Sequence, residues 1–188
     1  MLLRLSPEGR LRAPHFRHPW RSQERTPRWY NRRMIWKPNV VVAAMVERDG
    51  KFLLVEEHAD GALVLNQPAG HLDEGESLID AVIRETLEET AWHIEPQALL
   101  GIYRWPHPDK TVTYLRFAFV AEALREEPGR TLDTGIERAL WLTPQEIGAA
   151  HSRHRSPQVQ RCLNDYLTGT RYPLDLLRDY APARRHPT

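Results

Sequence analysis

Hydrophobic positions along the chain follow two different periods. β-Branched and other apolar residues concentrate at positions 39–47 and 51–57, and Asp49 and Gly50 between them are typical of a tight hairpin turn. Residues 77–90 instead place apolar side chains three and four positions apart, which is the spacing of one helix face. The pattern therefore predicts a strand hairpin that is followed, after a turn at 66–70, by an amphipathic helix.

The rest of the chain mixes strand and helix patterns without an internal repeat. We predict further strands at 63–65, 99–105, 111–123 and 138–142, and further helices at 144–150 and 157–167. Thr143 precedes the first of these helices as an N-cap residue. Because strands and helices do not alternate strictly, their order favours an α+β sandwich over a doubly wound parallel sheet.

Length and composition narrow the class of protein. The length of 188 residues corresponds to one domain, since domains hold roughly 100–200 residues. The single cysteine, Cys162, excludes a framework of intrachain disulfides. The longest apolar run, residues 40–46, is far shorter than the roughly 20 residues that cross a bilayer. We therefore expect a cytoplasmic protein without a membrane partner.

Residues 1–33 differ in charge from the rest of the chain. They hold nine arginines and two glutamates, a net charge of +7, whereas the whole chain carries +1. Four prolines interrupt this segment and no apolar period runs through it, so it cannot bury enough surface to offset its ordering entropy. We predict a disordered basic segment that is dispensable for folding, as an over-extended start would be, rather than a transit peptide or a nucleic-acid-binding arm.

The predicted helix at 77–90 carries a concentrated negative charge. Glu85, Glu88 and Glu89 fall on one side of it, within roughly a 100° arc at about 100° per residue. Like charges at this spacing repel one another, and we expect no basic residue of the helix on the same side. The pattern fits a solvated acidic face, or a site for Mg²⁺ or Mn²⁺, which prefer hard oxygen ligands.

The spacing of residues around this helix decides between the two readings. It resembles the Nudix box, G-x5-E-x7-R-E-U-x-E-E-x-G-U, through the following positions: Gly70, Glu76, Arg84, Glu85, Glu88 and Glu89. Two residues depart from the box. Thr86 stands where an aliphatic residue is usual, and its hydroxyl needs a partner. Ala91 stands where Gly usually ends the helix, and only Gly adopts the left-handed exit without steric cost.

The resemblance to Nudix hydrolases implies a fold, a cofactor and an activity. The fold is a Nudix α/β/α sandwich with a mixed sheet, which would occupy residues 34–180 and leave 181–188 as a flexible tail. Further short segments look like those of a group of bacterial phosphatases in the family: 66–72, 108–111, 115–117, 155–157 and 171–174. That group implies Mg²⁺-dependent hydrolysis of nucleoside tri- and diphosphates and of thiamine-type pyrophosphates, with release of inorganic phosphate.

The resemblance also assigns roles to single residues. The implied metal ligands are three carboxylates and one backbone carbonyl: Glu85, Glu88, Glu89 and Gly70. Proton removal falls to Glu85, Glu89 or Glu137, among which the sequence does not choose. Glu76 and Arg84 are expected to brace the loop as an ion pair rather than to take part in the chemistry.

Candidate substrate contacts lie outside the box. Lys110 and Arg116 are cations on or beside a predicted strand, where they could bind phosphate oxygens or form surface charges and structural pairs. Trp105 could stack on a base or a pyrimidine ring, or serve only as rim packing. The expected partners are small-molecule nucleotides or thiamine-type pyrophosphates, without nucleic acid, and the chain is expected to be a monomer or a homodimer.

Two other functions stay open from the sequence. The same fold could serve a hydrolase of dinucleoside polyphosphates, of ADP-ribose or of RNA 5′-pyrophosphate ends. It could also serve a non-catalytic Nudix-like binding module, although a pure binder has no need of three facing carboxylates.

Overall fold

The computed structural model describes residues 36–108 and 111–180 of the chain. The predicted basic segment at 1–33, the predicted tail at 181–188 and the predicted substrate contact Lys110 lie outside these described residues. No helix within the described ranges is long and apolar enough to cross a membrane.

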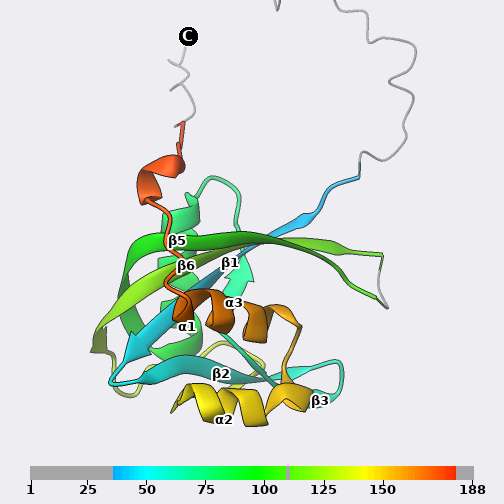
Figure 1. Cartoon of the computed structure of the whole chain (residues 1–188), viewed down its shortest axis with the longest axis vertical. Coiled ribbons are helices and arrows are strands. Elements are labelled where there is room, and N and C mark those ends of the chain that lie inside the picture. Colours follow the sequence, from blue (N-terminus) through cyan, green and yellow to red (C-terminus); the bar gives the residue numbers. More distant parts are fainter. Residues whose placement is uncertain (1–35, 109–110, 181–188) are drawn as a thin grey trace, which may run out of the picture. The chain divides into compact units, whose positions relative to one another are not determined.

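A mixed sheet forms the centre of the domain (Figure 1). Its strands in the described ranges are β1 (Asn39–Arg48), β2 (Lys51–Ala59), β3 (Ala62–Asn66), β4 (Ala69–His71), β5 (Trp92–Pro106), β6 (Thr113–Glu126) and β7 (Ile136–Leu142). The main order is β3-β2-β1-β6-β5, while β4 pairs with β1 and β7 pairs with β2. Since β1 runs parallel to β6 but antiparallel to β2 and β4, the predicted mixed sheet is confirmed.

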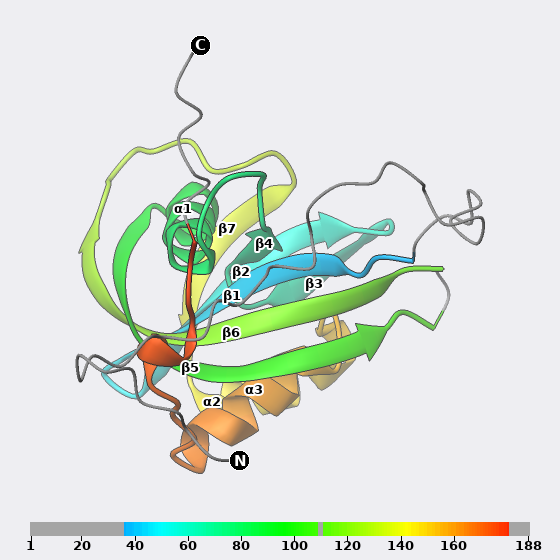
Figure 2. The ribbon, with the colours of Figure 1, turned by 90° about the horizontal axis from the view of Figure 1, so that it is seen from above.

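Helices cover both faces of this sheet (Figure 2). Helix α1 (Leu78–Thr90) lies on one face, and α2 (Pro144–Ala149) and α3 (Gln158–Leu167) lie on the other. Two single-turn 3₁₀ helices, η1 (His151–Arg153) and η2 (Leu174–Leu176), flank α3 along the chain. The arrangement is the α+β sandwich that the order of elements predicts.

The apolar run in β1 is continuous because both of its sides are buried. Val42, Ala44 and Val46 pack in one cluster with Ala81 and Val82 of α1. The alternate residues of β1 pack in a second cluster with α2 and α3; its members include Ala43, Met45, Ile147, Val159 and Leu163. Successive side chains of a strand point to opposite faces, so one strand anchors both helical layers.

The two departures from the Nudix box are accommodated locally in α1. The hydroxyl of Thr86 is fully buried and donates to the carbonyl of Val82 at 2.7 Å, so it has the partner that burial requires. Ala91 adopts the left-handed conformation with φ 61°, and its N–H bonds to the carbonyl of Leu87. The helix therefore ends as the box prescribes without its usual glycine. Ser77 caps the other end by accepting from the N–H of Asp80.

Two expectations about strands were wrong. The turn predicted at 66–70 overlaps the short strand β4, which pairs with β1 through Ala69, Gly70 and His71. The strand predicted at 99–105 is longer in the structure, where β5 begins at Trp92. The prediction missed the first part of this strand because the pairing of β5 with β6 contains three register shifts, one of them beside Pro96. Each shift breaks the alternation of polar and apolar positions on which the prediction rested.

Candidate active site

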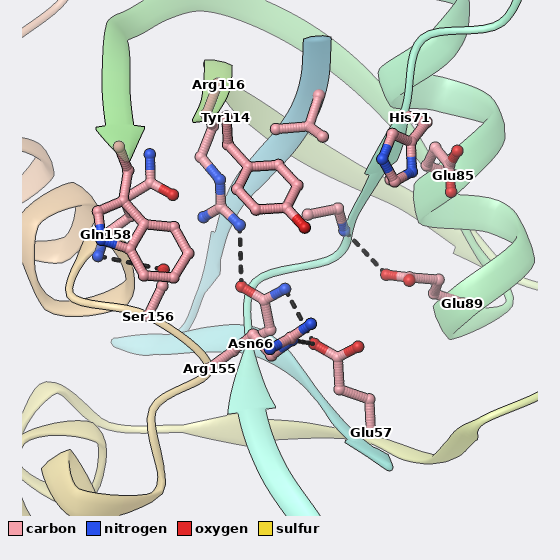
Figure 3. A pocket seen from close by; sticks show the side chains of 14 residues that line it. Glu57, Asn66, His71, Glu85, Glu89, Tyr114, Arg116, Arg155, Ser156 and Gln158 are labelled. Atoms are coloured by element: carbon pink, nitrogen blue, oxygen red, sulfur yellow. Dashed lines mark hydrogen bonds and ion pairs between the residues drawn. The ribbon is translucent and has the colours of Figure 1, made fainter. Parts of the chain in front are cut away.

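A cavity of about 340 Å³ opens where α1, β4 and the ends of β2, β3, β5 and β6 meet (Figure 3). It is lined by Val41, Glu57, Asn66, Ala69, Gly70, His71, Glu85, Glu89, Trp105, Tyr114, Arg116, Arg155, Ser156 and Gln158. Carboxylates from α1 lie on one side of it, and Arg116 and Gln158 lie away from them. The cavity therefore has an acidic side and a side rich in hydrogen-bond donors.

Gly70 and Glu85 lie in direct contact on the acidic side. A Cβ atom added to residue 70 would lie 2.0 Å from both Cδ and Oε2 of Glu85. No real pair of atoms tolerates this distance, so only glycine lets the carboxylate approach the backbone of β4. Gly70 thus brings a backbone segment and a carboxylate of α1 together, two of the predicted metal ligands.

Glu89 is the most deeply buried carboxylate of the site. Its side chain accepts a hydrogen bond at 2.8 Å from the backbone N–H of Ala69, and the residue is 9% exposed. Burial, together with the charges of Glu57, Glu85 and Asp133, raises the pKa of Glu89 to about 8, although the hydrogen bond from Ala69 opposes this shift. Burial also raises the pKa of Glu85. The acidic side holds more negative charge than its surroundings stabilise.

Arg84 organises the acidic face of α1, which corrects the expectation that no basic residue of the helix lies there. Its Nε and Nη2 donate to both oxygens of Glu76 at 3.0 and 2.6 Å. Its Nη1 donates to Glu85 at 2.8 Å and to Glu88 at 3.0 Å. Nη2 also donates to the carbonyl of His71 at 3.0 Å. The carboxylates of Glu76, Glu85 and Glu88 raise the pKa of Arg84, although burial opposes them. The guanidinium joins the loop, β4 and the helix.

We expect Arg84→Ala to lower the free energy of unfolding by about 1–3 kcal/mol, because it leaves the partly buried Glu76 without its partner. Activity should fall as well. Thermal melting of the variant tests this, with Arg125→Ala as the control, since the side chain of Arg125 is 64% exposed. Full stability together with lost turnover would place Arg84 in the chemistry instead.

Two of the predicted acidic residues do not line the cavity. Glu88 accepts a hydrogen bond from Arg84 and is not among the residues that line the cavity. Glu137 contacts His58 at 3.3 Å, and its side chain is 57% exposed. The cavity contains Glu57 of β2 instead, which sequence reasoning missed. The available signal was the pair Glu56-Glu57 that directly follows the apolar run of β2, although the pair does not show which of the two residues faces the site.

The residues of the acidic side fit a divalent cation. Within residues 36–108 and 111–180 no three His, Cys, Asp or Glu side chains converge as they stand, since Glu85 and Glu88 are bound by Arg84. However, the cradle that a Cβ of Gly70 would fill places the Glu85 carboxylate against the backbone, and Glu89 is desolvated beside it. Hard oxygen donors in this setting suit Mg²⁺ or Mn²⁺.

The metal-free protein should therefore lose stability as the pH rises. Glu89 has a pKa of about 8 when folded against 4.5 when unfolded, so between these values the folded state holds a proton that the unfolded state has released. The free energy of unfolding falls across that window. Denaturant titrations in EDTA at pH 5 and pH 8 measure this, and Glu89→Gln should reduce the difference. A stability that rises with pH in both proteins would contradict the expected effect.

The opposite side of the cavity holds the predicted substrate residues Arg116 and Trp105. Arg116 of β6 is 5% exposed and donates to the side-chain oxygens of Gln67 at 3.0 Å and Asn66 at 3.1 Å. Trp105 stacks on Tyr114 with ring centroids 5.8 Å apart. Arg116 and Trp105 both line the cavity, as a substrate contact would.

The loop after η1 and the first residue of α3 complete this wall with Arg155, Ser156 and Gln158, to which the sequence assigned no role in the site. The N–H of Arg155 bonds to the carbonyl of Leu65 at 2.8 Å. Next to it, Arg153 and Arg138 both bind the buried carboxylate of Glu56, and these arginines lower its pKa although burial opposes them. Contacts with β2 and β3, which are distant in sequence, thus hold this loop at the cavity. The local sequence of the loop does not reveal these contacts.

Fold and site together define a Nudix hydrolase, and the chain belongs to that family. A family profile described as NUDIX domain matches residues 36–162. The chain is 41% identical over 146 residues to Phosphatase NudJ of Escherichia coli (strain K12). The matched residues cover 78% of this chain and 94% of that relative. Phosphatase NudJ of Shigella flexneri matches to the same extent.

A solved structure agrees with this assignment. A NUDIX hydrolase from Nitrosomonas europaea superposes with a TM-score of 0.77 at 51% sequence identity, covering 78% of this chain and all of that one. The resemblance to the family, and to a group of bacterial phosphatases within it, is therefore confirmed.

Proposed function

We propose that the protein is a Mg²⁺-dependent phosphohydrolase that cleaves pyrophosphate linkages of nucleoside tri- and diphosphates and of thiamine-type pyrophosphates, with release of inorganic phosphate. Its relatives named Phosphatase NudJ support a phosphatase activity. One observation carries the proposal: a single cavity holds the Glu85–Gly70–Glu89 cluster on one side and Arg116 with an aromatic pair on the other. We further propose a cytoplasmic enzyme that works as a monomer or a homodimer.

The acidic side would hold the metal and the attacking water. Glu85, Glu89 and the carbonyl of Gly70 are the proposed ligands, and Glu88 would join them if Arg84 released its carboxylate. When bound, Mg²⁺ supplies positive charge beside the phosphoryl oxygens and makes a nearby water more acidic. Glu85 or Glu89 would accept the proton of that water, because both line the cavity and Glu137 does not.

The other side would bind the rest of the substrate. Arg116 is placed to bind the phosphoryl oxygens away from the carboxylates, since a guanidinium forms strong charge-assisted bonds with phosphate. Trp105 stacked on Tyr114 offers a flat apolar surface for a heteroaromatic ring. This combination favours a compact diphosphate ester that carries a ring.

Hydrolysis of a substrate panel, followed by chromatographic separation of the nucleotide products together with quantification of inorganic phosphate, tests the proposal. The panel contains nucleoside di- and triphosphates, thiamine pyrophosphate, ADP-ribose and a diadenosine polyphosphate, each with Mg²⁺. Release of inorganic phosphate from the first three classes supports the proposal. Turnover of only ADP-ribose or only the dinucleotide would assign the same fold to a different substrate, and no turnover of any of them would favour a binding module.

A further inference from the structure

Three side chains form a hydrogen-bonded chain across the floor of the cavity (Figure 3). Asn66 donates through Nδ2 to Oε1 of Glu57 at 3.1 Å. Its Oδ1 accepts from Nη2 of Arg116 at 3.1 Å. The neutral amide of Asn66 therefore lies between a carboxylate and a guanidinium. Its orientation is fixed, because a flipped amide would set its NH₂ group against the N–H of Arg116 and its oxygen against the carboxylate of Glu57.

Arg116 differs from the other arginine of the cavity in having no carboxylate partner. Among the described residues, its hydrogen bonds go to the neutral amide oxygens of Asn66 and Gln67, and its buried Nε has no partner. Arg155, by contrast, lies 3.2 Å from Asp60 and 3.9 Å from Glu57. A buried guanidinium that lacks a counter-ion is costly, so the arrangement calls for an anion at this position.

We propose that Asn66 is a positioning residue that keeps Arg116 unneutralised, and thereby sets the affinity for the phosphoryl group of the substrate that lies away from the carboxylates of α1. The amide orients the guanidinium by accepting one of its protons, and it binds Glu57 so that this carboxylate does not pair with Arg116. The inference rests on the proposed function, because it assumes a substrate with two linked phosphoryl groups.

The carboxylate variant of the same shape tests this assignment. Asn66→Asp places a negative charge against Arg116, so we expect KM for a nucleoside diphosphate to rise at least about 10-fold while kcat changes much less. Asn164→Asp is the matched control, since it makes the same change at an exposed position of α3 and should leave both constants unchanged. A KM of Asn66→Asp equal to that of the wild type would overturn the proposal.

A double variant distinguishes an effect of the ion pair between residue 66 and Arg116 from an effect of the total charge of the cavity. Asn66→Asp combined with Glu57→Gln restores the wild-type charge but leaves the carboxylate on Arg116, and it removes the repulsion between residues 57 and 66. We expect its KM to stay high, whereas Glu57→Gln alone should not reproduce that rise. Recovery of the wild-type KM in the double variant would show that only total charge matters. We expect the double variant to fold even if repulsion between the carboxylates at 57 and 66 unfolds the single one, and its KM then carries the test.

Binding without turnover distinguishes failure of this inference from failure of the proposed function. Calorimetric titration with methylenediphosphonate and Mg²⁺ should show at least about 10-fold weaker binding to Asn66→Asp and to the double variant than to the wild type. If wild-type protein binds this probe in an Asn66-dependent way but hydrolyses nothing, the inference stands and the function fails. If turnover is normal and all variants bind the probe equally, the inference fails and the function stands.

Discussion

Glu89→Gln is expected to lower kcat for a nucleoside diphosphate by at least about 100-fold while the fold stays intact. Glutamine keeps the shape of the side chain and an oxygen that can accept from the N–H of Ala69. It removes the charge that a divalent cation would need on this side of the cavity. Steady-state release of inorganic phosphate by purified variant and wild type measures the effect.

Binding of the metal gives this variant a second readout. Mg²⁺ should raise the melting temperature of the wild type more than that of Glu89→Gln, because a ligand stabilises only the state that binds it. Glu122→Gln, an exposed carboxylate on β6, is the matched control and should behave as wild type in both measurements. Unchanged turnover in a folded Glu89→Gln protein would remove Glu89 from the site.

Gly70→Ala should abolish most of the activity through one methyl group. The added carbon would lie 2.0 Å from the Glu85 carboxylate, so that carboxylate or β4 must move. Misplacement of a catalytic group by about 1 Å can cost roughly 100-fold in rate. Because the displaced atoms are the far end of the Glu85 side chain, we expect this loss in kcat and little change in the free energy of unfolding.

Gly148→Ala offers the matched control for that change. Gly148 lies in α2, and nothing is within 4 Å of the position that its Cβ would take. Alanine favours a helix over glycine, so this control should keep full activity and gain a little stability. Wild-type turnover in Gly70→Ala would show that contact between Glu85 and the backbone of β4 is not needed.

Local spacing explains why the acidic side could be predicted from the sequence. Helical geometry fixes the relation of Glu85 to Glu89, and the bidentate pair of Glu76 with Arg84 joins the two ends of the same motif. Arg84 was nevertheless misjudged, since a long side chain reaches a neighbouring face of the helix. Its Cα position alone therefore does not say which carboxylates it meets.

The sequence predicts Arg116 and Trp105 on the donor side, but it does not predict their neighbours, because these residues are distant in sequence. Asn66 and Arg116 meet only through the order of the strands, which depends on parallel pairing of β1 with β6. The position of Glu137 shows the same limit. The register of β2 against β7 shifts between Glu56 and Glu57, where Ile136 and Arg138 are the paired residues, and Glu137 is left facing His58. A one-residue bulge of this kind redirects a side chain without leaving a trace in the local sequence.

The most direct test of the account is the dependence of wild-type turnover on Mg²⁺. Phosphate release from a nucleoside diphosphate should be absent after EDTA treatment, should return as Mg²⁺ is added and should saturate. The same titration of Glu89→Gln should give at most about one hundredth of the wild-type plateau. Full turnover by the wild type in EDTA would contradict a metal-assisted reaction at Glu85, Gly70 and Glu89.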